Sequence, residues 1–201
     1  MVPFSIGEQT RGSVIRPACY CGVTGFKPTY DLLSMEGVLP LAKSLDTLGF
    51  FTHTAADMLA LWKAMGRPTG RKEQFQFAAP DPIPDCEPEM KDASQKALLL
   101  LGRSGVSIQK VDIAAILNSL NEAAILIQSF EGARFHEQRG KEHGSRLDQP
   151  LLDLVRDGLK IPVDQYAETK RYISASRFKL VEIFKSTPVI LTPAATGPAP
   201  F

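Results

Sequence analysis

A glycine- and proline-rich stretch at residues 7–30, GEQTRGSVIRPACYCGVTGFKPTY, constrains the fold more than any other part of the chain. Glycine permits positive φ angles and close backbone approach, whereas proline fixes φ, so such a stretch forms a shaped loop system rather than one long element. Only Val14-Ile15 and the segment 23–26 have the apolar character of ordinary buried chain. The candidate nucleophile in this stretch is Ser13. We therefore expect the rest of the chain to be organised around this loop system.

The composition is that of an ordinary globular protein, with 44% hydrophobic and 22% charged residues among 201. A chain of this length buries roughly 70% of its unfolded surface, so a core can form without disulfides or metal. The formal net charge of +1 gives no electrostatic reason to expect nucleic acid or a membrane surface as a partner. No apolar run approaches the ~20 residues that span a bilayer, and the N-terminus lacks the pattern of a signal peptide.

The three cysteines, Cys19, Cys21 and Cys86, argue against a disulfide framework, because their number is odd and two of them are only two positions apart. A reducing cytoplasm is the expected location. A Cys-x-Cys pair without further cysteines or histidines nearby is a poor zinc signal. The sequence therefore predicts no metal and no other cofactor.

The three histidines also lack the pattern of a metal site. His136 and His143 are surrounded by Glu, Arg and Lys, a mixture typical of a solvated helix end or loop. A metal site built on this pair and its glutamates is the alternative, but the spacing predicts no ligand geometry. We interpret His53 as structural.

The first part of the chain is predicted to consist of short pieces joined by turns. In order, these are a strand at 1–6, a turn-rich loop at 7–12, a short helix beginning near Pro17, an extended piece at 22–26, and a strand or bent loop at 32–41. We expect residues 44–54 to form a second loop that packs against the first. A buried helix should follow, with Thr54 as its N-cap and Gly66 as its stop.

The second part begins with a composition shift at 67–88, where five prolines among charges predict an irregular connection. The apolar spacing then predicts helices and strands in alternation: a helix at 89–101, a half-buried strand at 106–113, helices at 114–140, 148–158 and 164–185, and a buried strand at 189–191. A Pro/Gly-rich tail ends the chain. Helix, glycine break and alternating strand together indicate an α/β protein.

The residues at 10–13 suit acyl transfer. A serine hydroxyl is a weak nucleophile until a base takes its proton, and pre-aimed backbone N–H groups stabilise the oxyanion that forms after attack. Thr10-Arg11-Gly12-Ser13 supplies both a hydroxyl and a loop of closely spaced amides. The motif differs from the Gly-x-Ser-x-Gly elbow, because Ile15 stands two residues after Ser13. On its own, a Gly-Ser pair in a loop more often forms a simple turn.

The order of motifs along the chain resembles the amidase signature family. The matching groups are Gly7, Gly12-Ser13, Pro17-Ala18, Tyr20-Cys21-Gly22, Gly25-Phe26-Lys27-Pro28-Thr29, Ser44-Leu45-Asp46 and the tail segment 189–200. The resemblance implies a partial α/β/α sandwich with a mixed β-sheet, truncated at both ends. It also implies one partial amidase domain over 1–201, comprising a signature region at 1–66, the connection at 67–88 and a remainder at 89–201.

The resemblance assigns roles within the loop. Ser13 would be the acyl-accepting nucleophile, and the backbone N–H groups of Thr10, Arg11, Gly12 and Ser13 would form the oxyanion hole. Three positions depart from the common pattern: Gln9 replaces Asp, Arg11 replaces Gly, and the arginine falls one place later, at Arg16. The Arg11 side chain would either point outward or intrude on the substrate.

The family's lysine and bridging serine lie on the N-terminal side of the nucleophile, and this chain begins 12 residues before Ser13. The resemblance thus implies an amidase fragment, inactive alone, from an enzyme that hydrolyses a carboxylic amide through an acyl-serine intermediate. Its partners would be a small-molecule amide and either a complementing N-terminal half or a second copy bound at exposed sheet edges. The alternative is a non-catalytic remnant that serves as a binding or interaction module.

Overall fold

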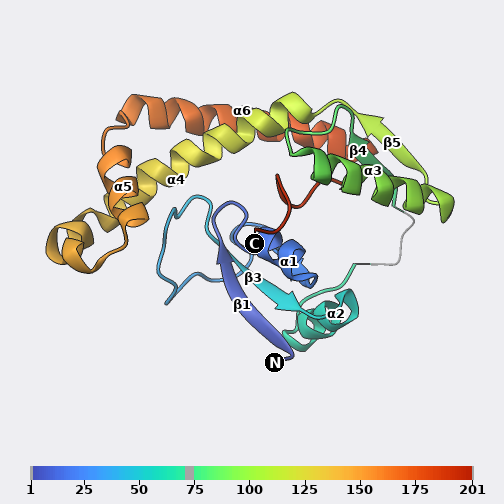
Figure 1. Cartoon of the computed structure of the whole chain (residues 1–201), viewed down its shortest axis with the longest axis horizontal. Coiled ribbons are helices and arrows are strands. Elements are labelled where there is room, and N and C mark those ends of the chain that lie inside the picture. The colour runs from blue at the N-terminus through green and yellow to red at the C-terminus, as the bar shows by residue number, and fades with distance from the viewer. Residues whose placement is uncertain (1, 71–74, 201) are drawn as a thin grey trace.

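The computed structural model describes residues 2–70 and 75–200, which form a mixed α/β structure (Figure 1). The elements follow in the order β1 (Phe4–Gln9), α1 (Ile15–Cys21), β2 (Thr24–Phe26), β3 (Thr47–Thr52), α2 (Ala55–Ala64), β4 (Phe77–Pro80), α3 (Pro88–Arg103), β5 (Ile108–Val111), α4 (Ala114–His143), a 3-10 turn η1 (Gly144–Arg146), α5 (Gln149–Gly158), α6 (Val163–Ser186) and β6 (Val189–Ile190). No helix in these described ranges is long and apolar enough to cross a membrane.

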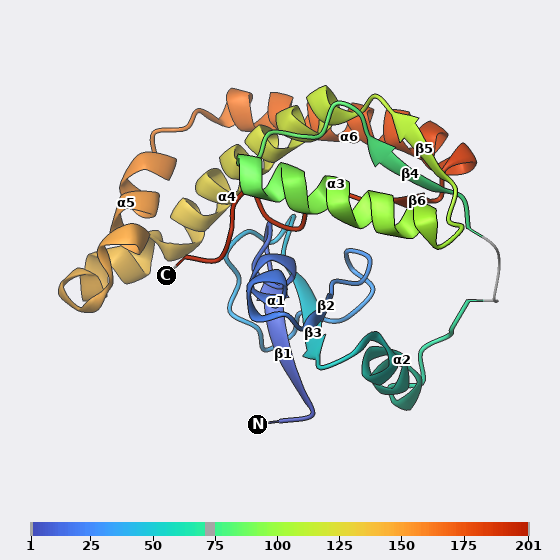
Figure 2. The ribbon, with the colours of Figure 1, turned by 45° about the vertical axis from the view of Figure 1, so that its right-hand side comes forward.

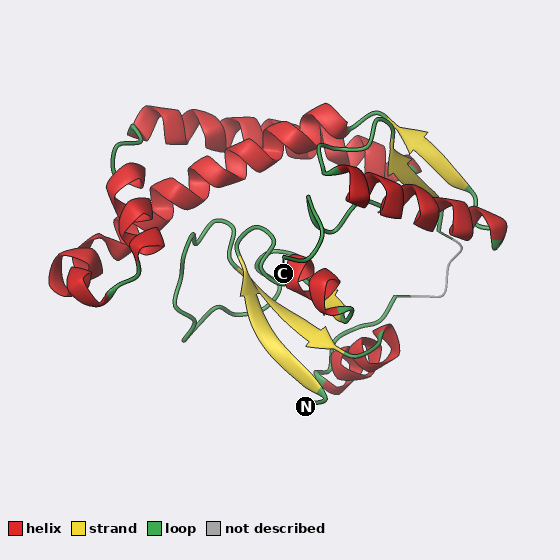
Figure 3. Ribbon diagram, viewed as in Figure 1, coloured by secondary structure: helices red, strands yellow, loops and turns green. Residues whose placement is uncertain are grey.

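The described strands form two separate sheets (Figure 3). The first is antiparallel with the order β1-β3-β2, and the second is parallel with the order β5-β4-β6. The fold class predicted from the sequence is confirmed. Parallel and antiparallel strand pairs both occur, but each kind has its own sheet instead of sharing one mixed sheet.

Helices cover both faces of the second sheet. Figure 2 shows α3 on one side of this sheet and α6 on the other, and α4 runs beside α6. Around the first sheet, α1 and α2 pack on the strands, with a small core of Leu33, Phe50 and Met58 between them. The ring edge of Trp62 meets the face of Phe26 at a centroid distance of 5.2 Å. The loop before α1 therefore lies between two sheet-and-helix units.

The junction between α4 and α5 is close enough to exclude a side chain. Gly158, at the end of α5, is buried, and a Cβ at this position would lie 2.6 Å from the Ala133 Cβ and within contact distance of the Ser129 carbonyl oxygen. Arg134 holds the same junction from α4, because its guanidinium donates to the Gly158 and Ile161 carbonyl oxygens, each at 3.1 Å. Glycine is therefore required where the two backbones meet.

The prediction of a loop at 44–54 is wrong, because its central part is β3, the middle strand of the first sheet. The strand has buried residues on both of its faces, so the apolar alternation that marks a half-buried strand is absent. Gly49 in its middle disfavours a strand by local propensity. Pairing with β1 on one side and β2 on the other overrides that propensity.

Two further strand predictions need correction. The first strand continues to Gln9, so residues 7–9 are part of the sheet rather than of the predicted loop. The proline-rich connection contains β4, whose Ala78 and Ala79 are buried at the centre of the second sheet. Alanine is a weak strand former, and prolines flank the segment, so the local sequence disfavours a strand that tertiary pairing stabilises.

The other predicted elements are confirmed within a few residues: the short helix at Pro17, the extended piece at 22–26, the bent loop at 32–41, and the helices and strands at 55–65, 89–101, 106–113, 114–140, 148–158, 164–185 and 189–191. The helix α2 is less buried than the sequence predicts, since Met58 is its one buried residue and Leu59 is exposed. On α6, the large apolar side chains of Tyr172, Phe178, Val181 and Phe184 are exposed to solvent, with Phe178 77% exposed.

The sequence predicts that His136 lies in a solvated helix end or loop, and this prediction is wrong. The side chain is buried, and its Nδ1 accepts a hydrogen bond of 2.9 Å from Arg139. Burial and the nearby Arg139 charge lower the pKa of His136, so the ring is neutral at pH 7. The prediction fails because α4 continues to His143 and the loop at 40–44 packs against residues 131–136 of this helix. His143, in contrast, is exposed, as predicted.

Candidate active site

The loop that carries Ser13 is held from behind by Gln9, the last residue of β1. The Gln9 side chain is buried, and its Oε1 accepts hydrogen bonds from the N–H groups of Val14 (2.9 Å) and Ile15 (3.0 Å). These donors begin α1 and have no partner within the helix. Gln9 stands where the common amidase pattern has Asp, and it provides the same kind of acceptor from a longer side chain.

Close packing of α1 on the first sheet fixes the height of the loop. Val14 is completely buried over Gly49 of β3. A Cβ at Gly49 would lie 2.9 Å from the Val14 Cγ2 and 2.9 Å from the Phe26 carbonyl oxygen. Because glycine leaves this space empty, Val14 at the start of α1 packs directly on the sheet, next to the exposed Ser13.

The four residues predicted at the site line one pocket of about 490 Å³. Thr10, Arg11, Gly12 and Ser13 form one wall. The facing walls come from distant parts of the chain: Pro84, Asp85 and Cys86 before α3, Asn118, Asn121 and Gln128 on α4, and the tail from Thr192 to Thr196. Figure 1 shows the red tail leaving the second sheet toward the loop before α1.

The chemistry available in the pocket is a hydroxyl beside open backbone amides. Among the described residues, none of the N–H groups of the 10–13 wall donates a hydrogen bond. Neither lysine nor histidine occurs among the described residues that line the pocket. Besides the Ser13 hydroxyl, the described lining contains the carboxylate of Asp85 and the guanidiniums of Arg11 and Arg16 as its charged groups.

A pair of carboxylates lies below the pocket wall. The Thr10 hydroxyl is 2.8 Å from Asp46 Oδ1 and 3.2 Å from Glu8 Oε1, so it bridges the two acids. The other Asp46 oxygen accepts from the N–H groups of Leu41 and Ala42, both at 2.9 Å. Burial, reinforced by the hydrogen bond to Asp46 and by its charge, raises the pKa of Glu8 to about 7. Below that pH, Glu8 is protonated and can share its proton with Asp46.

This pair predicts a loss of stability as the pH rises. The folded pKa of Glu8 lies above its ordinary value of 4.5, so its stabilising contribution is complete below pH 4.5 and is lost as the pH rises through 7. Partial solvent exposure limits the effect to about 1 kcal/mol, or roughly 2–4 °C in thermal midpoint. Thermal melts at pH 5 and pH 8 should show this difference in the wild-type chain and not in Glu8→Gln.

The control for this measurement is Glu36→Gln, which removes the same charge from an exposed loop position. We expect this variant to keep the pH dependence of the wild type. If Glu8→Gln and wild type lose the same number of degrees between the two pH values, then Glu8 does not titrate in this range.

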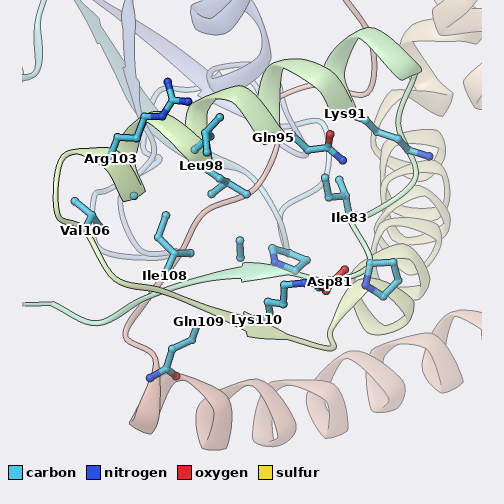
Figure 4. Close-up of a pocket in the computed structure, with 15 residues that line it drawn as sticks. Asp81, Ile83, Lys91, Gln95, Leu98, Arg103, Val106, Ile108, Gln109 and Lys110 are labelled. Carbon is cyan, nitrogen blue, oxygen red and sulfur yellow. Dashed lines mark ion pairs between the residues drawn. The ribbon is translucent and has the colours of Figure 1, made fainter.

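A larger cavity, of about 750 Å³, lies between α3 and the strands β4 and β5 (Figure 4). Its walls are mainly apolar, with Leu98 from α3 facing Ile108 from β5. Lys110 and Asp81 form an ion pair of 2.7 Å at its edge. No hydroxyl, thiol or imidazole occurs among the described residues that line this cavity, so the smaller pocket around Ser13 is the candidate active site.

Sequence reasoning missed the wall that α4 contributes. Asn118, Asn121 and Gln128 are spaced so that they share one face of the helix. Amide side chains at helical spacing in the mainly apolar first half of the helix are the signal that could have identified them. In the described residues, no cluster of His, Cys, Asp or Glu could hold a metal ion, and the three cysteines are free thiols.

The chain is similar in sequence to known proteins. It is 32% identical over 168 residues to a mitochondrial glutamyl-tRNA(Gln) amidotransferase subunit of Aedes aegypti, covering 72% of this chain and 34% of that protein. It is 33% identical over 126 residues to the indoleacetamide hydrolase of Pseudomonas syringae pv. syringae, covering 58% of this chain and 28% of that protein. The chain thus spans about a third of the length of these curated relatives.

The fold matches a solved amidase crystal structure with a TM-score of 0.88 and 28% identity, over 98% of this chain and 46% of that one. The profile of the Amidase family matches residues 1–201, the whole chain. The chain belongs to the Amidase family.

Proposed function

We propose that this chain carries the nucleophile-bearing part of an amide hydrolase that converts a carboxylic amide to a carboxylate and an amine. The observation that carries the proposal is the position of Ser13 in a pocket beside backbone N–H groups without partners among the described residues. The Ser13 Oγ attacks the amide carbonyl carbon, and the amides of 10–13 stabilise the resulting oxyanion. Departure of the amine leaves an acyl-serine, which water hydrolyses.

The proton of the Ser13 hydroxyl requires a base, and in the family that the chain resembles a lysine acts through a bridging serine. We propose that both groups come from outside these 201 residues, from a complementing N-terminal half. Loss of one member of a nucleophile–base unit costs on the order of 10⁴ to 10⁶ in rate, so the chain alone should be inactive on amides. A cytoplasmic location is part of the same proposal.

Covalent labelling of Ser13 tests the proposed nucleophile directly. The Ser13 oxygen displaces fluoride from a fluorophosphonate probe, and at pH 9 solvent can accept the proton that a missing base would take. We expect mass spectrometry to find one adduct, on the peptide that contains Ser13. The adduct should be absent in Ser13→Ala and retained in Ser104→Ala, which removes an exposed hydroxyl on the far end of α3.

The alternative is a non-catalytic member of the family that acts as a binding or interaction module. It is favoured by the absence of lysine and histidine from the described lining of the pocket. If wild type and Ser13→Ala show the same labelling, the catalytic proposal fails and this alternative replaces it.

A further inference from the structure

Two arginines line the pocket that contains Ser13. Arg11 belongs to the 10–13 wall, and Arg16 lies in the first turn of α1. Both side chains are exposed, and neither forms an ion pair with a carboxylate in the described part of the chain. The common amidase pattern has glycine at the position of Arg11, so this guanidinium is a feature of this chain.

The two arginine side chains line the same pocket, so their like charges share one site. The pKa of Arg11 is lowered, first by burial and second by the charge of Arg16. Both groups stay protonated at neutral pH, since arginine is effectively always charged in proteins. Two like charges beside each other without a counter-ion are unfavourable, and an anion placed between them removes that cost.

The remaining polar groups of the pocket do not neutralise the pair. Asp85 is the single acidic residue among the described lining, and its Oδ2 accepts a hydrogen bond of 3.1 Å from Asn118. Asn121 and Gln128 contribute neutral amides. Two arginines against one aspartate leave a formal charge of +1 on the lining, which favours an anionic ligand.

We propose that Arg11 and Arg16 bind anionic groups of the substrate, and that Arg11 selects an amide with two carboxylates over an amide with one. A guanidinium forms a planar fork that holds a carboxylate by two parallel hydrogen bonds, so each arginine can hold one carboxylate. Arg11 thereby becomes a specificity-determining residue of the pocket. The identity of the ligand as an amide rests on the proposed function, whereas the preference for charge rests on the two arginines.

The test compares the affinities of three related amides that carry no, one and two carboxylates: succinamide, succinamate and (carbamoylmethyl)malonate. Their dissociation constants are measured by isothermal titration calorimetry with the Ser13→Ala chain, which prevents turnover. We expect succinamate to bind more tightly than succinamide, and the dicarboxylate to bind about 10-fold more tightly than succinamate, as one additional charge-assisted bidentate pair implies.

Substitution of Arg11 should remove the difference in affinity between the dicarboxylate and succinamate. It should leave the difference between succinamate and succinamide. In Arg11→Gln, we expect the dicarboxylate to bind within about twofold of succinamate, since a single fork remains. Arg11→Lys keeps the charge and should retain part of the difference in affinity between the dicarboxylate and succinamate. Arg177→Gln removes an exposed arginine of α6 outside the pocket, so it should leave the dissociation constants of all three amides unchanged.

The inference is overturned if the dicarboxylate binds no more tightly than succinamate, or if Arg11→Gln weakens all three amides equally. Its failure can be distinguished from failure of the proposed function. If Ser13 is labelled but the three amides bind with equal affinity, Arg11 has no such role and the hydrolase proposal stays intact. If affinity increases with each added carboxylate but Ser13 is not labelled, the result supports the role of Arg11 in a pocket that binds its ligand without acyl transfer.

Discussion

Replacing Gly158 with alanine should lower the thermal midpoint by about 6–12 °C, which corresponds to about 3 kcal/mol for a domain of this size. The added Cβ would lie 2.6 Å from the Ala133 Cβ and against the Ser129 carbonyl oxygen. Both obstacles are fixed to the helical backbone of α4, so they cannot rotate away as a flexible side chain could. The helix α5 must therefore move, and the hydrogen bonds from Arg134 to the carbonyls of Gly158 and Ile161 are lost with it.

A matched substitution separates this steric effect from the general effect of replacing glycine. Gly102 lies in the last turn of α3, and a Cβ there would meet no atom within 4 Å. Gly102→Ala should be neutral or stabilise the chain by up to about 1 kcal/mol, because alanine loses less backbone entropy in a helix. A Gly158→Ala melt within a degree of wild type would mean that α5 does not pack against α4 this closely.

The second large effect is expected at Gln9. Gln9→Ala removes the acceptor for the Val14 and Ile15 N–H groups at a position that is 6% exposed. Each buried donor left without a partner costs about 1–3 kcal/mol, so the two together should cost about 2–6 kcal/mol. The 10–13 wall also loses its support, and a displacement of about 1 Å at a reacting group can slow a reaction 10²-fold. We therefore expect fluorophosphonate labelling of Ser13 to fall at least 10-fold.

Gln9→Glu is the matched control, because it keeps an acceptor oxygen at the same distance along the side chain. Urea unfolding and the labelling rate should both recover most of the loss seen with alanine. Equal damage by Gln9→Glu and Gln9→Ala would show that the acceptor is not what holds the loop. Normal labelling in a destabilised Gln9→Ala chain would separate the stability of the loop from its role at Ser13.

The regular elements of the second part were predictable because each carries its own periodic signal. The long helix α4 and the strand β5 have apolar residues at spacings of about 3.6 and 2 residues, which local sequence displays directly. Thr54 likewise predicted the start of α2, where its side chain and that of Asp57 form a capping box. These features depend on neighbours within a few positions along the chain.

The missed features depend on partners that are distant in sequence. The strand β3 is stabilised by β1 and β2, and β4 by β5 and β6, while their own residues suggest loops. His136 is buried because the loop at 40–44 packs against residues 131–136 of α4, which no pattern within α4 can indicate. For the site, the motifs identified the 10–13 wall, whereas the facing polar residues became visible only when α4 and the tail met that wall.

The walls of the pocket come from positions near 10, 120 and 194, so the cavity exists only while both sheets and α4 are in place together. Any molecule that fills it is bound by the native state alone and adds RT ln(1 + [L]/Kd) to the free energy of unfolding, about 2.7 kcal/mol at a hundredfold excess over Kd. A ligand in the pocket would therefore stabilise parts of the chain that are far from Ser13. Amide hydrogen exchange should slow in the strands of both sheets at once, which makes the ligand a cross-link between segments separated by more than 180 residues.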